Sequence, residues 1–176
     1  MKEKEIRPKK IFNKFLHLAS RDAKKYFNKK KVKVNCVACG GKGKFSFKKK
    51  NFSYWVCQNC ETLFVNPRPK ADAFQNYYTK SSSIKFLAST LYEKTKESRK
   101  KKIWIPKAKM IFEKLKKKIK NYSCVDIGGG SGIFAKEIFK LIKRDVMVIE
   151  PSPFMAEACR KKKLQVIQKF LESVEK

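Results

Sequence analysis

The spacing of hydrophobic and polar positions changes along the chain, and each change predicts a different kind of element. Between residues 9 and 31, apolar side chains recur at helical spacing, which predicts an amphipathic helix. Residues 33–66 alternate over short runs, as β-strands do. Residues 70–120 return to a helical pattern, which residues 81–83 interrupt and in which Pro106 suits the first turn of a helix.

The C-terminal part, residues 121–170, combines short apolar runs with helical segments. This order is typical of a parallel α/β sheet, in which a helix crosses over between successive strands. The expected strands are 122–125, 145–149 and 164–167, and the expected helices are 133–143 and 153–163.

Four cysteines form two pairs with the same internal spacing, Cys36 with Cys39 and Cys57 with Cys60. This is the spacing of a four-thiolate zinc site, because two intervening residues let both sulfurs of a pair reach one edge of a tetrahedron. Two disulfides and reduced structural cysteines are the alternatives. The charged N-terminus, which lacks a signal-peptide pattern, favours zinc and a cytoplasmic location. Because thiolates fill all four positions, the zinc is predicted to be structural.

The segment around the cysteine pairs predicts a small zinc ribbon. Residues 44–47 and 52–56 form a hairpin across 48–51, and a third strand over 62–65 stops at 66–69. A domain of this size has too little core to hold itself, so the metal is expected to supply folding free energy.

A glycine-rich loop follows the first strand of the predicted parallel sheet. It contains Asp126, Gly128, Gly130 and Gly132, and Glu150 ends the next strand. Glycines allow the backbone to approach a nucleotide-like ligand closely, and the following helix offers free amide donors. An acid at the end of the second strand accepts hydrogen bonds from ribose hydroxyls. The alternative for Glu150 is a surface acid before a turn.

Two classes of cofactor fit this loop, and a purely structural turn is the third interpretation. Gly130-x-Gly132-x-x-Ala135 satisfies a dinucleotide pattern, so the glycines alone leave NAD and FAD open. Asp126 favours S-adenosylmethionine. A carboxylate before the loop would repel a pyrophosphate, whereas it suits a cofactor that carries an ammonium group.

Taken together, the motifs resemble class I S-adenosylmethionine-dependent methyltransferases that carry an N-terminal zinc ribbon. The resemblance rests on the two cysteine pairs, the ribbon exit at 63–69, the segment 74–78 before a helical bridge, and the loop at 126–132. It implies an α/β fold with a Rossmann-like sheet, in which the loop and Glu150 hold S-adenosylmethionine. Tyr78 is a weaker cofactor contact and is interpreted as a packing residue.

The resemblance also implies what the chain lacks. The sheet of that family has seven strands in the order 3-2-1-4-5-7-6, and this sequence supplies strands 3-2-1 only. We therefore expect a fragment, or one part of a split enzyme with a complementing C-terminal polypeptide, that is inactive alone. The expected domains are an N-terminal helix at 1–32, the zinc ribbon at 33–69, a helical bridge at 70–120, and a partial cofactor-binding domain at 121–176.

The formal charge of +30, from 45 Lys and Arg against 15 Asp and Glu, indicates affinity for polyanions. Only 6 of the 45 basic residues are Arg, and the positive charge as a whole is spread evenly along the chain. Both observations favour a solvated surface over a nucleic-acid footprint. The predicted function is methyl transfer to a small molecule or sugar-type substrate. The alternatives are an RNA methyltransferase and a zinc-ribbon nucleic-acid-binding protein. No catalytic residue is assigned, since the single histidine, His17, lies in the first helix. No apolar run approaches the roughly 18 residues of a membrane span.

Overall fold

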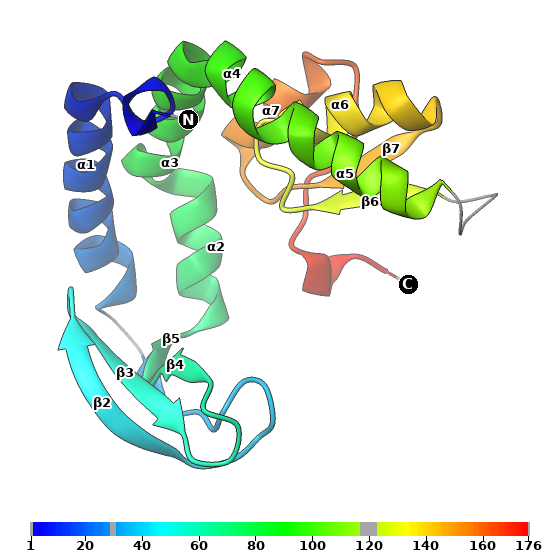
Figure 1. The fold of residues 1–176 in the computed structure, drawn as a ribbon. Helices are drawn as coiled ribbons and strands as arrows, with labels where there is room; N and C mark the ends of the chain where they lie inside the picture. Colours follow the sequence, from blue (N-terminus) through cyan, green and yellow to red (C-terminus); the bar gives the residue numbers. More distant parts are fainter. Residues whose placement is uncertain (1, 29–30, 117–122, 176) are drawn as a thin grey trace. The chain divides into compact units, whose positions relative to one another are not determined.

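The computed structural model describes residues 2–28, 31–116 and 123–175 (Figure 1). The chain divides into two compact units. One comprises His17–Tyr77, and the other comprises Met1–Leu16 together with Tyr78–Lys176. Each unit has a hydrophobic cluster of its own. Among the described residues, no helix is both long enough and apolar enough to cross a membrane.

The unit His17–Tyr77 contains a three-stranded antiparallel sheet in the order β2-β3-β4. The strands are β2 (Gly43–Lys49), β3 (Phe52–Cys57) and β4 (Leu63–Val65). Lys50 and Asn51 connect β2 to β3, and both have positive φ, which a two-residue hairpin turn requires. The hairpin and third strand expected from the sequence are therefore confirmed.

A bulge in β2 separates two phenylalanines that strict alternation would place on one face. Phe45 is paired with Trp55, whereas Phe47 is paired with Tyr54, and the register shifts between them. Because Tyr54 and Trp55 are neighbours along β3, their side chains point to opposite faces of the sheet. The extra residue thus turns Phe47 to the face opposite Phe45.

The expectation about the N-terminal border of the ribbon is wrong. The first helix, α1, spans Lys9–Phe27 rather than reaching residue 31, because β1 (Lys31–Val32) pairs with β5 (Arg68–Pro69). The third strand does end at Val65 as expected, and Arg68 and Pro69 then form a separate short strand that the sequence did not predict. The Asn66 side chain fastens the same pair of segments by accepting a hydrogen bond from the Val34 amide at 3.0 Å. Helical periodicity carries no information on such a long-range pairing.

An aromatic cluster joins the helical part of this unit to the ribbon. The Phe27 ring, at the end of α1, lies 5.0 Å from each of the Phe74 and Tyr77 rings of α2 (Ala71–Lys80). It also lies 6.0 Å from the Phe52 ring at the start of β3. Phe27 is buried as a result, and α1 ends at this residue.

The second unit contains a three-stranded parallel sheet in the order β6-β7-β8. Its elements are β6 (Cys124–Ile127), α6 (Ile133–Ile142), β7 (Val146–Ile149), α7 (Pro153–Arg160) and β8 (Gln165–Ile167). The chain is therefore a mixed α/β protein with a zinc ribbon, and its sheets are small. The first strand starts and ends later than the expected 122–125, so Asp126 lies within the strand; residue 122 is outside the described residues.

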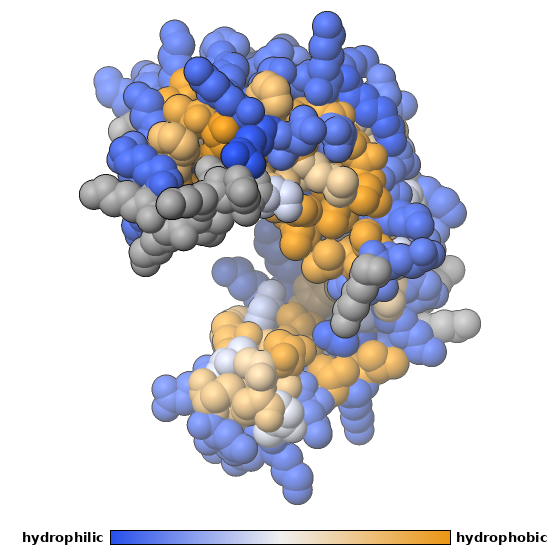
Figure 2. All heavy atoms as spheres, turned by 90° about the vertical axis from the view of Figure 1, so that its right-hand side faces the viewer, coloured by the Kyte–Doolittle hydropathy of each residue, from blue (hydrophilic) through white to orange (hydrophobic). Residues whose placement is uncertain are grey.

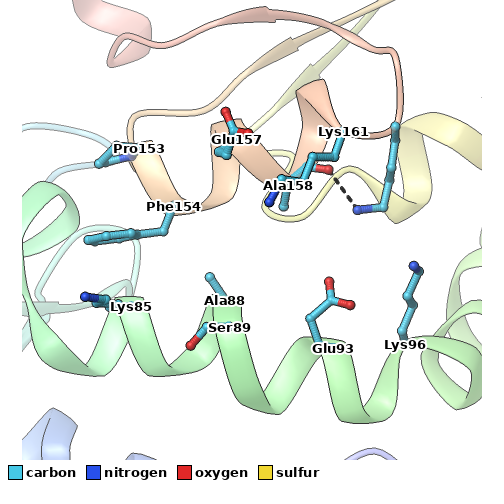
Figure 3. Close-up of a pocket in the computed structure, with 11 residues that line it drawn as sticks. Lys85, Ala88, Ser89, Glu93, Lys96, Pro153, Phe154, Glu157, Ala158 and Lys161 are labelled. Atoms are coloured by element: carbon cyan, nitrogen blue, oxygen red, sulfur yellow. Dashed lines mark hydrogen bonds between the residues drawn. The ribbon is translucent and has the colours of Figure 1, made fainter.

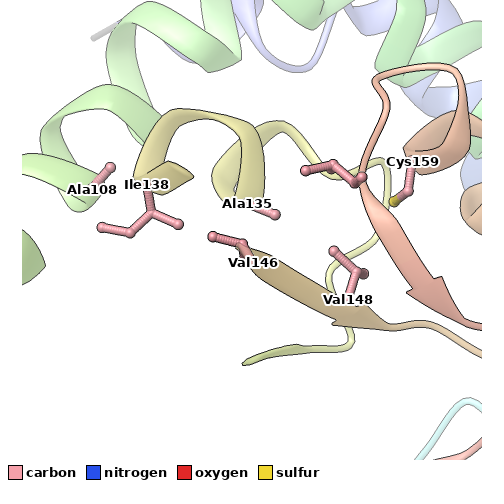
Figure 4. Close-up of a cluster of buried hydrophobic side chains, with 7 residues drawn as sticks. Ala108, Ala135, Ile138, Val146, Val148 and Cys159 are labelled. Atoms are coloured by element: carbon pink, nitrogen blue, oxygen red, sulfur yellow. The ribbon is translucent and has the colours of Figure 1, made fainter. Parts of the chain in front are cut away.

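The core of this unit lies between the parallel sheet and the helices α5 (Ile105–Leu115) and α6 (Figure 4). Val146 and Val148 of β7 point into it, and it also contains Ala108, Ala135, Ile138, Cys159 and Leu164. On the other face of β6, Val125 and Ile127 are 48% and 57% exposed.

A nearly continuous helical run precedes α5. It comprises α3 (Ser82–Phe86), the π-helical segment η2 (Leu87–Tyr92), α4 (Glu93–Arg99) and the π-helical segment η3 (Lys100–Trp104). The Ser81 hydroxyl caps α3 by accepting a hydrogen bond from the Ile84 amide, and Pro106 lies in the first turn of α5. The expected helical region is confirmed with its interruption at Ser81, whereas at Pro106 the helical run continues without a break. Two short 3-10 turns, η1 (Glu3–Glu5) and η4 (Leu171–Ser173), complete the elements.

Candidate functional site

The four ribbon cysteines come together at one end of β3. Their Sγ atoms all lie within 4.8 Å of one another, with 3.6 Å between Cys36 and Cys60 and 3.5 Å between Cys39 and Cys57. Four sulfurs at about 2.3 Å from a tetrahedral zinc ion would be about 3.8 Å apart, so the cluster has the size of the metal site. A disulfide needs about 2.05 Å, and all four thiols are free, which excludes the disulfide alternative.

The two cysteine pairs share the same backbone geometry. The amide four residues after the first cysteine donates to that cysteine's carbonyl oxygen, from Gly40 to Cys36 at 2.9 Å and from Glu61 to Cys57 at 3.1 Å. The amide two residues after it donates to its Sγ at 3.4 Å in both pairs. Gly40 and Glu61 both have positive φ. Two equivalent turns thus present two sulfurs each, with amide donors already directed at the thiolates.

Packing holds the first cysteine of each pair, and the second remains accessible. Cys36 and Cys57 are buried with Phe64 and are packed against Trp55, whereas Cys39 and Cys60 are exposed. Glycine is required beside this cluster, because a Cβ on Gly43 would lie 2.6 Å from the Phe64 ring. The core of the ribbon is therefore built around the cysteines themselves.

Hydrogen bonds within the cluster lower the pKa of some of the cysteines and raise that of others. The Thr62 hydroxyl, with the Thr62 amide, lowers the pKa of Cys60 to about 6. The Gly41 amide acts to lower the pKa of Cys39, but the thiols of Cys60 and Cys57 outweigh it and raise that pKa to about 12. A metal ion removes this competition, since it binds thiolates and releases their protons.

The glycine loop connects β6 to α6 at the carboxyl end of the parallel sheet. Gly128, Gly130 and Gly132 all have positive φ, a conformation that side chains other than glycine rarely adopt. The Gly128 amide donates to the Ile149 carbonyl at 2.8 Å, which fastens the loop to the end of β7.

The sequence-predicted acids lie on either side of this loop. The Glu150 carboxylate is buried and accepts hydrogen bonds from the Gly130 amide at 2.8 Å and the Ser152 amide at 2.9 Å. Asp126 projects from β6 under the loop, and a Cβ built on Gly129 would lie 3.0 Å from its Oδ2 atom. The structure thus brings Asp126, the glycines and Glu150 together at one end of the sheet.

Asp126 lacks a partner for one of its oxygens. Its Oδ2 atom is buried and makes no hydrogen bond with any described residue. Burial, with a smaller contribution from the nearby Glu150 charge, raises the pKa of Asp126 to about 6. A buried, unpaired carboxylate is costly, and a bound cationic group would remove that cost.

A cavity of about 110 Å³ lies against the outer side of the loop. Three residues of the helical run, Tyr92, Arg99 and Trp104, face the loop across it. None of the three was predicted from the sequence, because a helical pattern rich in lysine does not show which side chains turn toward a ligand. The π-helical segments, which often occur at functional sites, end at Tyr92 and Trp104. Tyr78 instead contacts Phe170 edge-on at 6.0 Å.

A larger cleft, of about 660 Å³, lies between the helices η2 and α4 on one side and α7 on the other (Figure 3). None of the sequence-predicted site residues lines it. Lysines and glutamates from both sides line it, and the Lys162 ammonium donates to the Ala158 carbonyl at 2.9 Å. His17, the only histidine of the chain, is exposed on α1 and lines neither cavity.

Comparison with known proteins supports the ribbon. Residues 31–64 match the family described as the zinc-binding domain of primase-helicase. No curated protein matches the chain significantly. The match and the four-cysteine cluster together identify a zinc-ribbon domain, with Cys36, Cys39, Cys57 and Cys60 as its candidate metal ligands.

The metal centre predicts the zinc content of the protein. Wild type should contain one zinc per chain, and Cys60→Ser should lose most of it because three thiolates leave the tetrahedron open. Elemental analysis after dialysis measures the content. Cys124→Ser, outside the cluster, is the matched control and should keep its zinc. Full zinc content in the Cys60 variant would contradict the assignment.

The raised pKa of Asp126 predicts how stability depends on pH. In the unfolded chain this carboxyl ionises near pH 4, whereas in the folded chain it ionises near 6, so ionisation destabilises the fold as the pH rises between these values. Asp126→Asn should therefore become more stable than wild type above pH 7, by about 1 kcal/mol after allowance for solvent screening.

Urea unfolding at about pH 4.5 and about pH 7.5, on either side of the pKa of Asp126, measures the difference in the free energy of unfolding between the variant and wild type. The matched control for loss of a carboxylate is Asp145→Asn at an exposed position. A stability gain in Asp126→Asn that is equal at both pH values would contradict the assigned cause.

Proposed function

We propose that the chain binds S-adenosylmethionine at the glycine loop and serves in methyl transfer. The observation that carries the proposal is the buried, unpartnered Asp126 oxygen under the loop. The ammonium group of the cofactor would neutralise it. A dinucleotide would instead bring a pyrophosphate toward Asp126 and Glu150, where like charges repel. The chemistry of the donor set therefore favours a cofactor with a cationic end.

Glu150 is the candidate ribose contact. An ionised carboxylate offers about four lone-pair directions, and the amides of Gly130 and Ser152 occupy two of them. The remaining directions suit two ribose hydroxyls. The same hydrogen bonds hold the Glu150 side chain against the loop, so that it is oriented before the cofactor binds.

When bound, S-adenosylmethionine supplies a methyl carbon that a nucleophile displaces in line from the sulfonium. The residues of this chain would bind and orient the cofactor. Holding the methyl carbon close to the nucleophile is how they would contribute to the reaction rate. The described cavity of about 110 Å³ is smaller than the roughly 300–1,000 Å³ of pockets that enclose whole ligands. It accommodates part of the cofactor only. As acceptor we keep the small molecule of sugar type that the resemblance suggests.

Calorimetric titration with S-adenosylhomocysteine, which retains the ammonium and the ribose, tests this proposal. Wild type should bind it and should not bind NAD. Asp126→Asn and Glu150→Gln should each weaken binding by at least about 10-fold, the effect of losing a charge-assisted hydrogen bond. Asp145→Asn is the control. Tighter binding of NAD than of S-adenosylhomocysteine would overturn the proposal.

A second candidate function, single-stranded nucleic-acid binding, is favoured by the ribbon. The Phe47 and Tyr54 rings stack at 4.9 Å with an interplanar angle of 15°, and Phe47 is 41% exposed. Figure 2 shows apolar side chains on the ribbon surface, at the bottom of the view, bordered by hydrophilic ones. The family that matches residues 31–64 is described as the zinc-binding domain of primase-helicase. Exposed lysines flank the ring pair at positions 44, 48, 49 and 50.

Such a ring pair is suited to stacking on a base, and the lysines to contacting phosphates. Trp55, which follows Tyr54 in β3, packs against the cysteine cluster instead. The bulge in β2 is what turns Phe47, and not Phe45, to the face of Tyr54.

Fluorescence anisotropy with single-stranded RNA and DNA oligonucleotides tests the ribbon surface. Phe47→Ala should weaken binding by about 10-fold through the loss of one stacking contact. Phe45→Ala, the same change two residues away on the opposite face, is the matched control. The titrations are run at low and at physiological salt. Binding that disappears at physiological salt, with equal affinities of the two variants, would show charge attraction alone and contradict the stacking surface.

A further inference from the structure

Arg99 is the one charged side chain that lines the cavity over the glycine loop, among the described residues. It comes from the last turn of α4, far from the loop in sequence. The Arg99 guanidinium therefore faces the place where the proposed cofactor would contact the loop.

Three neighbours hold the guanidinium in place. Its Nε donates to the Thr95 hydroxyl at 3.1 Å, and its Nη2 donates to the Ile6 carbonyl at 3.3 Å. The Thr95 hydroxyl is itself oriented, since it donates to the Leu91 carbonyl at 2.6 Å. The guanidinium carbon also lies 4.7 Å from the centre of the Tyr92 ring. The side chain is thus fixed before any ligand binds.

These contacts leave the charge of Arg99 without a counter-ion. No carboxylate of the described residues forms an ion pair with it, although the side chain is half-buried. Burial lowers the pKa of Arg99 for this reason. A guanidinium has five N–H donors, and the two hydrogen bonds above use two of them. The remaining three suit a carboxylate, which such a fork binds with two parallel hydrogen bonds.

We propose that Arg99 binds the carboxylate of the cofactor's methionyl end, which completes the recognition of an α-amino acid that Asp126 begins. The inference rests on the proposed cofactor. Both charges are near Gly129: its Cβ position lies 3.0 Å from the Asp126 Oδ2 atom, and Gly129 lines the cavity together with Arg99. A cavity of about 110 Å³ suits the methionyl part rather than the nucleoside.

Two ligands separate this contact from the rest of the site. S-adenosylhomocysteine carries the amino-acid end, and methylthioadenosine has the same nucleoside and sulfur without it. In calorimetric titrations of the full zinc-loaded chain, Arg99→Met should weaken binding of S-adenosylhomocysteine by about 10- to 100-fold, the worth of charge-assisted hydrogen bonds. Binding of methylthioadenosine should stay within about twofold of wild type, because it makes no contact with Arg99.

Arg160→Met is the matched control, since Arg160 lies in the same unit and its side chain is exposed in an ion pair with Glu157. Arg99→Lys keeps the charge and loses the fork, so it should show an intermediate loss for S-adenosylhomocysteine only. Equal weakening of both ligands by Arg99→Met would show a structural role through Ile6 and Thr95 and overturn the inference. Unchanged S-adenosylhomocysteine binding would overturn it while leaving the proposed function intact. Wild type that binds neither ligand would overturn both.

Discussion

Both units contain acidic groups that need a bound cation, the four thiols of the ribbon and the Asp126 carboxylate under the glycine loop. In the ribbon, four thiols lie within 4.8 Å of one another, and few other buried side chains support the fold around them. In the other unit, the Asp126 oxygen under the glycine loop has no hydrogen-bond partner among the described residues. Each arrangement is costly until a cation satisfies it, zinc in the first case and the ammonium group of a ligand in the second.

The acidic groups at the two candidate sites contrast with the positive net charge of the whole chain. The net charge is +30, yet the two candidate sites are built from cysteines and carboxylates. Arg99 is the exception, because it faces the glycine loop with its charge unpaired. A zwitterionic amino-acid group fits the pair that Asp126 and Arg99 form, one anion and one cation, and a bare polyanion does not. The lysines therefore support nucleic-acid contacts at the ribbon surface and a general affinity for polyanions. They do not help to identify the cofactor.

The sequence predicted the features that depend on local spacing. The cysteine pairs could be interpreted as a metal site because the two-residue spacing itself sets the geometry, and the positions of Asp126 and Glu150 followed from the strand–loop–helix order. Features that depend on distant partners were missed. The pairing of β1 with β5 ended α1 early, and a single bulge at residue 46 decided which phenylalanine stacks on Tyr54.

The helical run over the glycine loop was missed for a related reason. Its elements were expected, but the orientation of Arg99 depends on the Ile6 carbonyl, which lies 93 positions earlier in the chain. The assignment of the parallel sheet to a methyltransferase remains a prediction, carried by the loop and its two acids. The zinc ribbon has independent support from the family match over residues 31–64.

The central claim is that the glycine loop is a ligand site for S-adenosylmethionine. Amide nitrogen–proton NMR spectra of the ¹⁵N-labelled chain, recorded while S-adenosylhomocysteine is added, test it directly. The account predicts that the amide signals of Gly128, Gly130 and Ser131 shift, while those of Cys36 and Cys57 in the ribbon do not. Loop signals that stay unchanged at saturating ligand, or shifts confined to the ribbon, would contradict it.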